Sequence, residues 1–330
     1  MKIIMYGTKP IEKSYVEAWE KKTDNTVKMV VDLLNDDTVD MAKGFDGVVT
    51  QQTQSLGSSD VYKKLASFGI KQVGLRTAGY DMVDLDAANA NGITITRVSI
   101  YSPRAIAEMG VTQAMYLNRK IGLFNQRMTD DHDFSWAPDL VSNEIFNLTV
   151  GIIGLGHIGG ATAQIYKALG AKVIAYDPFY DPEQEAFVDY TDLDTVLRES
   201  DIISLHTPLF PSTKNIINAD SLKKMKKTAY LINMARGGLV DTQALIKALQ
   251  DGEIAGAGLD TLADETTYFG KKVSADQVPE DYKTLAAMPN VVVTPHVAFF
   301  TKTSVRNMVE IALNDTVTIV NGGKTRNAVR

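Results

Sequence analysis

An apolar run that ends in a glycine-rich turn and continues into a helical pattern places the strongest constraint on the fold of this chain. Residues 150–159 read VGIIGLGHIG, so Gly154, Gly156 and Gly159 form a G-x-G-x-x-G arrangement. In such a turn the first glycine permits the tight bend, the second lets the backbone approach a pyrophosphate, and the third lets the helix pack closely on the strand. The pattern predicts a strand, a phosphate-binding turn and a helix whose N-terminus faces the phosphate charge.

Short β-rich runs alternate with helical stretches on both sides of this turn. The expected strands are 2–6, 27–31, 47–51, 72–76 and 93–98 before the turn, and 150–154, 171–177, 201–206, 229–233, 254–260 and 291–295 from the turn onward. Strands separated by helices indicate parallel sheets covered on both faces. We therefore expect an α/β protein with a Rossmann dinucleotide-binding domain and a smaller, flavodoxin-like α/β domain.

Two long helical patterns are expected to connect these domains. The first begins at Pro103, after a possible capping residue, Ser102, and runs to about residue 117. The second covers 303–320 and is amphipathic, so it should return to the first domain. Residues 129–147 are polar with scattered aromatics and read as a connecting arm, whose acidic cluster at 130–133 is read as solvated rather than as a metal site.

Composition excludes several classes of protein. The 330 residues include no cysteine, which rules out disulfides, thiolate metal sites and iron–sulfur clusters. A formal charge of −6 opposes binding to nucleic acid or to an anionic membrane. The first residues lack the apolar length of a secretory signal, and no stretch is long enough to span a membrane, so a cytoplasmic location is expected.

A carboxylate follows the second strand of the Rossmann pattern. Asp177 stands about 20 residues beyond the glycines, where such a group accepts hydrogen bonds from the adenosine ribose. Residues 178–181 contain neither Arg nor Lys, so a 2′-phosphate would meet a like charge with no local cation. The sequence favours NAD over NADP, although Asp177 could instead be a turn or cap residue.

Carbonyl reduction needs a proton donor, and histidine has the pKa nearest to neutral pH. Of the four histidines, His132 lies in the polar arm, His157 in the glycine turn, and His206 at the end of a strand. His296 follows the last apolar strand at its carboxyl end, where open α/β sheets form their ligand crevice. It is the candidate acid, although a lone histidine is more often structural.

Two further residues strengthen the choice of His296. Arg236 follows a strand and precedes paired glycines, and its planar fork suits a substrate carboxylate. It could equally be a surface arginine at a strand end. Glu265 lies five residues beyond Asp260, and a nearby carboxylate would favour the protonated form of His296 and fix its orientation, whereas Asp264 should point elsewhere.

With these residues the chain resembles the D-2-hydroxyacid dehydrogenase family, and within it the D-lactate dehydrogenase branch of lactic-acid bacteria. The resemblance spans essentially the whole length. Its most specific segments are 76–81 (RTAGYD), 101–108 (YSPRAIAE), 154–159 (GLGHIG), 235–237 (ARG), 258–260 (GLD) and 294–296 (TPH).

The resemblance implies an NAD-dependent enzyme that interconverts pyruvate and D-lactate, with Arg236, Glu265 and His296 as its catalytic set. It implies that Ala78, Gly79, Tyr101, Arg236 and His296 bind the substrate, the first two through backbone N–H groups. Around the NAD it places, besides the three glycines, His157, Ile158, Asp177, Thr207, Pro208, Thr213, Met234, Ala235, Arg236 and Asp260. It also implies a split substrate domain, 1–101 with 300–330, an NAD-binding domain at 102–299, and a homodimer joined through the NAD-binding domains.

Departures from the family pattern leave alternatives open. Relatives often have Asn-Val-Pro before the Tyr-Ser-Pro element, where this chain has Arg97-Val98-Ser99-Ile100, and many have a tyrosine at the position of Phe300. An enzyme of larger 2-keto acids, of the hydroxyisocaproate type, therefore remains an alternative. A dinucleotide-sensing binding protein with this fold is a third reading, opposed by the presence of all three catalytic side chains.

Overall fold

The computed structural model describes residues 1–329, which form two compact units. One unit comprises Met1–Ser102 and the C-terminal segment from Phe300, and the other comprises Pro103–Phe299. The chain passes between them twice, after Ser102 and after Phe299.

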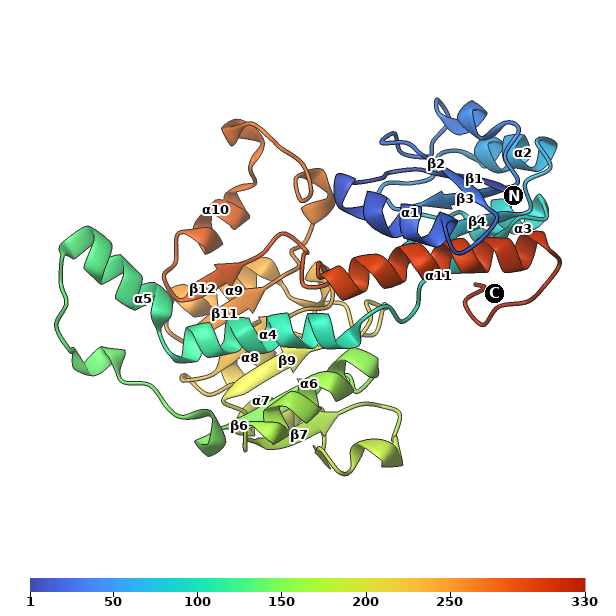
Figure 1. The fold of residues 1–330 in the computed structure, drawn as a ribbon. Helices are drawn as coiled ribbons and strands as arrows, with labels where there is room; N and C mark the ends of the chain where they lie inside the picture. Colours follow the sequence, from blue (N-terminus) through green and yellow to red (C-terminus); the bar gives the residue numbers. More distant parts are fainter. Residues whose placement is uncertain (330) are drawn as a thin grey trace. The chain divides into compact units, whose positions relative to one another are not determined.

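The first unit is built on a five-stranded parallel sheet, in the flavodoxin-like order β2-β1-β3-β4-β5. Its strands are β1 (Lys2–Met5), β2 (Thr26–Met29), β3 (Gly47–Thr50), β4 (Gln72–Leu75) and β5 (Thr94–Arg97). Its helices are α1 (Lys13–Glu20), α2 (Ser59–Ser67), α3 (Leu85–Ala90) and α11 (Lys302–Val320). Within this unit α1 and α11 cover one face of the sheet, and α2 and α3 pack against the core on the other (Figure 1).

The alternation of burial explains these layers. Ile3 and Met5 of β1 pack against Leu313 of α11, while Ile4 between them packs among Val61 and Leu65 of α2. Successive side chains of a strand point to opposite faces, so a strand covered on both sides must be apolar throughout.

The second unit contains a seven-stranded parallel sheet in the order β12-β11-β10-β9-β6-β7-β8. The strands are β6 (Thr149–Ile153), β7 (Lys172–Tyr176), β8 (Asp189–Tyr190), β9 (Ile202–Leu205), β10 (Tyr230–Asn233), β11 (Gly256–Leu259) and β12 (Val291–Val293). The helices are α4 (Pro103–Asn118), α5 (Ile121–Gln126), α6 (His157–Ala168), α7 (Leu193–Glu199), α8 (Ala219–Lys224), α9 (Thr242–Gln250) and α10 (Glu280–Ala286). This is the Rossmann order, with its switch point between β6 and β9.

Most predicted elements are present, with two differences. The six-strand prediction for the Rossmann sheet is wrong by one, because β8 has only two residues and is too short to show a periodicity. The helices predicted as connections, α4 and α11, each belong to a single unit, and the chain crosses between units immediately before each helix begins.

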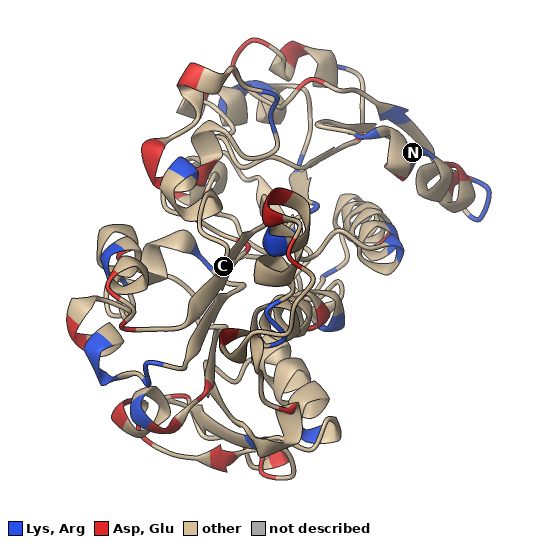
Figure 2. Ribbon diagram, turned by 90° about the vertical axis from the view of Figure 1, so that its left-hand side faces the viewer, with Lys and Arg blue, Asp and Glu red and all other residues tan. Residues whose placement is uncertain are grey.

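The arm at 129–147 begins within a π-helical turn (Arg127–Asp131) and contains two short 3-10 helices (Pro138–Leu140 and Ile145–Asn147). In residues 1–329, no group of three or more His, Cys, Asp or Glu side chains is arranged to hold a metal ion. The helices of the described chain are all too short or too polar to cross a bilayer. Acidic and basic residues are interspersed along both units in the view of Figure 2.

Candidate active site

The three residues predicted to be catalytic follow three adjacent strands of the Rossmann sheet. Arg236 comes after β10, Glu265 after β11 and His296 after β12. These strands are neighbours and run parallel, so their carboxyl ends lie on one edge of the sheet. Sequence positions separated by up to 60 residues thus reach the same edge, where open α/β sheets form their ligand crevice.

His296 and Glu265 are in direct contact. The imidazole Nδ1 lies 2.5 Å from Glu265 Oε1, and the other carboxylate oxygen accepts a hydrogen bond of 2.8 Å from the backbone N–H of Leu262. The Glu265 side chain is 15% exposed and that of His296 is 36% exposed. Because Nδ1 faces the carboxylate, Nε2 is the ring nitrogen left for proton transfer to a substrate.

The backbone at His296 is held in an unusual conformation. Its φ is +55°, in the left-handed region, and its N–H donates to the carbonyl oxygen of Asp260 at 2.8 Å. The buried Asp260 carboxylate accepts from the backbone N–H groups of Val297 and Ala298, both at 2.9 Å, and from Thr294 Oγ1 at 2.5 Å. Asp260 therefore anchors the loop that presents the imidazole.

Hydrogen bonds to a neighbouring side chain also fix the turn that bears Arg236. The buried Asn233 side chain accepts from the N–H of Ala235 at 3.0 Å and donates to the carbonyl oxygen of Arg236 at 2.9 Å. Gly237 has no room for a side chain, because a Cβ there would lie 2.0 Å from the carbonyl carbon of Leu262. The segment after Arg236 thus packs backbone to backbone against the segment that precedes Glu265.

The Arg236 guanidinium remains available for an anion. Its Nη1 donates to the carbonyl oxygen of Ala235 at 2.9 Å, and no carboxylate of residues 1–329 forms an ion pair with it. A partly exposed guanidinium without a carboxylate partner is suited to bind the carboxylate of a ligand.

The other three histidines are less suited to act as the acid. Burial lowers the pKa of His206 to about 3, so its ring is neutral at pH 7, and its Nε2 is 2.9 Å from Ser204 Oγ. His132 is exposed in the arm, and His157 is the exposed first residue of α6. His132 does not follow a strand, and His157 follows β6 in the glycine turn, where the phosphate is expected.

The glycine turn has the properties that a diphosphate site needs. Gly154 adopts a φ of +94°, and a Cβ on Gly159 would lie 1.9 Å from the carbonyl oxygen of Gly154, so both positions require glycine. A Cβ on Gly156 would meet no atom within 4 Å. The turn therefore keeps open space beside Gly156, at the N-terminus of α6, where phosphate charge is favoured.

Asp177 lies against this turn. Its Oδ2 accepts from the N–H of Leu155 at 2.6 Å, and its Oδ1 accepts from the N–H of Phe179 at 2.8 Å. The carboxylate is thereby held beside the phosphate turn at the end of β7, the position from which it can bind ribose hydroxyls. The glycines, the helix N-terminus and this carboxylate together fit a dinucleotide.

The remaining predicted cofactor residues occupy different environments. Thr213 closes the loop after β9, since its hydroxyl donates to the carbonyl oxygen of Pro208 at 2.7 Å and accepts from the N–H of Phe210 at 2.7 Å. Thr207 begins the same loop. Met234 is buried and packs against Gly110 of α4, so a contact of this residue with a cofactor would use its backbone.

The predicted substrate residues of the first unit lie on two segments after its strands. Ala78 and Gly79 follow β4, and the Thr77 hydroxyl donates to the carbonyl oxygen of Gly79 at 2.7 Å. Tyr101 follows β5, and its carbonyl oxygen accepts from Asn307 Nδ2 of α11 at 2.6 Å.

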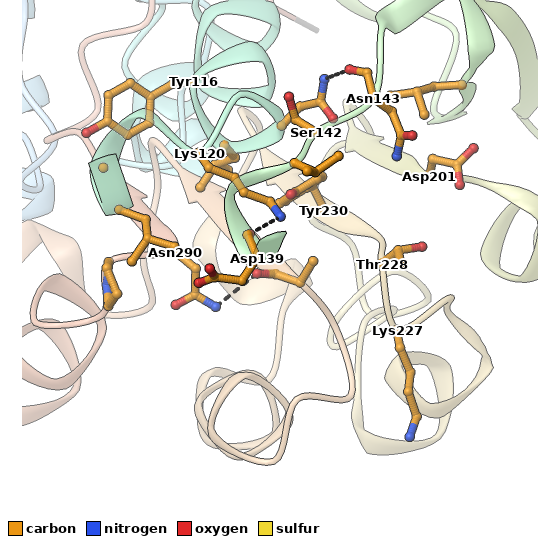
Figure 3. Close-up of a pocket in the computed structure, with 18 residues that line it drawn as sticks. Tyr116, Lys120, Asp139, Ser142, Asn143, Asp201, Lys227, Thr228, Tyr230 and Asn290 are labelled. Atoms are coloured by element: carbon orange, nitrogen blue, oxygen red, sulfur yellow. Dashed lines mark hydrogen bonds between the residues drawn. The ribbon is translucent and has the colours of Figure 1, made fainter. Parts of the chain in front are cut away.

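A cavity of about 440 Å³ lies elsewhere in the second unit. Figure 3 shows Asp201 and Tyr230 among its lining residues; these residues stand at the amino ends of β9 and β10. The cavity is therefore at the edge of the sheet opposite to His296 and is separate from the candidate active site.

Comparison with known proteins decides the family. Residues 111–298 match the model of the D-isomer-specific 2-hydroxyacid dehydrogenase NAD-binding domain. A D-lactate dehydrogenase of Lactiplantibacillus plantarum is 42% identical, over 100% of this chain and 99% of the relative. The chain belongs to the D-2-hydroxyacid dehydrogenases.

Solved structures of this family agree in fold. The NAD complex of a D-isomer-specific 2-hydroxyacid dehydrogenase from Lactobacillus delbrueckii ssp. bulgaricus has a TM-score of 0.95 and 58% identity, with 100% of both chains covered. A D-lactate dehydrogenase with NAD⁺ from Lactobacillus jensenii has a TM-score of 0.94 and 55% identity, again over 100% of both chains. The present dehydrogenase is thus an NAD-dependent enzyme of 2-hydroxy acids and their 2-keto counterparts.

Sequence reasoning missed the residues that support the site. Asn233, Thr294 and Gln113 were not singled out, although Asn233 holds the Arg236 turn and Gln113 Nε2 donates to Thr294 Oγ1 at 2.9 Å. A polar residue as the last residue of an otherwise apolar strand, as in YLIN at 230–233, is the signal that could have identified Asn233.

Proposed function

We propose that this dehydrogenase is a D-lactate dehydrogenase that reduces pyruvate to D-lactate with NADH, and that it runs the reverse reaction with NAD⁺. The contact between His296 and Glu265, beside the turn that bears Arg236, carries the proposal. It is the arrangement needed to add a proton to a carbonyl oxygen next to a carboxylate. The similarity to proteins named D-lactate dehydrogenases supports pyruvate as the substrate.

Each catalytic residue has a role that follows from its chemistry. Arg236 binds the pyruvate carboxylate through two parallel N–H···O bonds and orients the neighbouring keto group. His296 donates the proton from Nε2 to the keto oxygen as negative charge develops there. Glu265 holds the imidazole by Nδ1 and fixes its orientation. NADH, when bound, supplies the hydride.

The cofactor-binding residues are proposals of the same kind. Gly154, Gly156 and Gly159 with His157 and Ile158 would bind the diphosphate, and Asp177 the adenosine ribose. The remaining positions would line the rest of the dinucleotide: Thr207, Pro208, Thr213, Met234, Ala235, Arg236 and Asp260. In the first unit, the N–H groups of Ala78 and Gly79 would bind the substrate carboxylate, and Tyr101 would line the substrate pocket. This assigns substrate binding to 1–101 with 300–330, and NAD binding to 102–299.

A homodimer joined through the NAD-binding domains is also proposed. The arm of the second unit exposes large apolar side chains, of which Phe134 is 74%, Trp136 99% and Phe146 60% exposed. Such residues are typical of surfaces that another chain covers. Light scattering should give the mass of two chains, and Trp136→Asp should lower this mass.

A cytoplasmic location stays a prediction that cell fractionation can test.

The decisive experiment compares 2-keto acids. NADH absorbance is followed with pyruvate, phenylpyruvate and ketoisocaproate, and the handedness of each product is determined. The proposal predicts the highest kcat/KM for pyruvate and a D product. A clear preference for ketoisocaproate would favour the alternative of a hydroxyisocaproate-type enzyme, and an L product or no turnover would refute the assignment.

A further inference from the structure

We propose that Arg97 is a positioning residue that orients and polarises the peptide between Ala78 and Gly79, so that its N–H binds the substrate carboxylate more strongly. The inference rests on the proposed function, which gives the N–H groups of Ala78 and Gly79 that role. It adds a residue at which this chain departs from the Asn-Val-Pro pattern frequent in the family. All the contacts involved lie within the first unit.

Three successive carbonyl groups of the loop after β4 are held by separate donors. The carbonyl oxygen of Thr77 accepts from the N–H of Val98 at 3.0 Å, that of Ala78 accepts from Arg97 Nη1 at 3.1 Å, and that of Gly79 accepts from the Thr77 hydroxyl at 2.7 Å. Arg97 is the last residue of β5, and Val98 follows it directly. Each peptide plane of the loop is thereby fixed through its oxygen.

Fixing an oxygen fixes the N–H of the same peptide. The described chain contains no cis peptide bond, and in a planar trans peptide the N–H points opposite to the C=O. The N–H of Gly79 shares its plane with the carbonyl of Ala78, so Arg97 sets its direction. Within residues 1–329, no group accepts a hydrogen bond from the N–H of Ala78 or Gly79. Both donors therefore remain available for a ligand.

The charge of Arg97 also strengthens the donor. A cation that binds a peptide oxygen withdraws electron density from the peptide, which makes its N–H a better donor to an anion. Among the described residues no carboxylate pairs with this guanidinium, so its charge is not cancelled locally. Arg97 therefore adds positive potential behind the peptide, on its carbonyl side, while the N–H that is proposed to bind the substrate acid points to the opposite side.

The Tyr80 ring holds the guanidinium in place. The guanidinium carbon of Arg97 lies 5.0 Å from the centre of this ring, and the ring itself packs against the core of the first unit. Stacking of a planar guanidinium on an aromatic face restricts its orientation. Lysine keeps the charge and a donor but lacks the planar group that stacks on the ring, so it can replace Arg97 only in part.

The test separates binding of the acid from chemistry and from folding. Turnover of pyruvate by the wild type is established first, so that failure of the proposed function would appear there. Arg97→Met, which keeps the aliphatic stem, is then expected to raise the KM for pyruvate and the inhibition constant of oxamate, a pyruvate analogue that cannot be reduced, each about tenfold. The kcat at saturating pyruvate, the Kd for NADH and the melting temperature should stay near their wild-type values.

Three further variants sharpen the result. Arg97→Lys should recover part of the lost affinity, and Tyr80→Leu should raise the KM less than Arg97→Met does. Arg326→Ala, which removes an exposed arginine of the same unit, should leave both constants unchanged. Wild-type pyruvate KM and oxamate inhibition in Arg97→Met would overturn the proposal. The proposal would also be overturned if Arg97→Met lowered NADH affinity, kcat and melting temperature to the same extent and Arg97→Lys did not restore them. That result would indicate a general structural role for Arg97.

Discussion

The imidazole Nδ1 of His296 lies 2.5 Å from Oε1 of Glu265, across 31 positions of sequence. The second oxygen of Glu265 is occupied by the Leu262 N–H, so the carboxylate is held in one orientation. The hydrogen bond to Nδ1 fixes the orientation of the imidazole and leaves Nε2 facing away from the carboxylate. This orientation suits the proposed transfer of a proton from Nε2 to a keto oxygen.

Replacing the charge of Glu265 tests this pairing. In Glu265→Gln the charge-assisted hydrogen bond to Nδ1 is replaced by a weaker neutral one that holds the ring less firmly, so kcat for pyruvate reduction should fall at least about tenfold while the Kd for NADH is retained. The measurement is steady-state kinetics with pyruvate, with NADH titrated on the same sample. Asp264→Asn, at the exposed neighbouring position, should leave kcat unchanged. A wild-type kcat in Glu265→Gln would contradict the role of Glu265.

Two glycines of the phosphate turn should respond differently to the same substitution. Gly156→Ala adds a methyl group into open space, so the melting temperature should be retained while the Kd for NADH rises at least about tenfold through collision with the diphosphate. Gly159→Ala places the methyl group 1.9 Å from the Gly154 oxygen and should destabilise the fold by about 1–3 kcal/mol. Calorimetry and NADH titration distinguish the two effects, and unchanged NADH affinity in Gly156→Ala would argue against this cofactor position.

Arg236→Lys is expected to fail mainly in substrate affinity. A point charge cannot reproduce the two parallel bonds of a guanidinium, so the KM for pyruvate should rise by about 100-fold, while NADH binding is retained. Steady-state kinetics with NADH titration checks this. Arg104→Lys, on an exposed face of α4 where the side chain pairs with Glu108, is the matched control and should behave as wild type.

His206 should make the fold sensitive to acid. Burial lowers its pKa from 6.5 to about 3 in the folded protein, whereas the unfolded chain takes up the proton near 6.5. Between these values the unfolded state binds more protons, so the free energy of unfolding decreases as the pH falls through this window. His206→Gln should lose less stability between about pH 7 and about pH 5 than the wild type. Denaturant unfolding at both pH values is the measurement, with the exposed His132→Gln as control; an identical loss in His206→Gln would contradict the prediction.

The sequence predicts those parts of the site whose residues lie close together along the chain or directly after an apolar strand. Gly154, Gly156 and Gly159 lie within one stretch, residues 154–159, so their spacing alone indicates the strand, the bend and the helix. His296 and Arg236 stand directly after apolar strands, which is enough to place them at a carboxyl edge.

What sequence does not predict depends on contacts between distant segments. The interaction of Asp260 with the N–H groups of Val297 and Ala298 joins residues 37 and 38 positions apart, and no local pattern records it. Arg97 looks like a departure in sequence, and only the register of β4 and β5, which pairs Leu75 with Arg97, brings it over the loop at Ala78. The two-residue strand β8 is missed because pairing with β7, not its own residues, defines it.

The most direct test of the account is His296→Ala, assayed for pyruvate reduction with NADH binding measured on the same sample. Loss of the proton donor should reduce kcat by about 10²–10⁴-fold while the Kd for NADH stays close to that of the wild type. Pyruvate reduction at the wild-type rate by His296→Ala would contradict the assignment of His296 as the acid of this dehydrogenase.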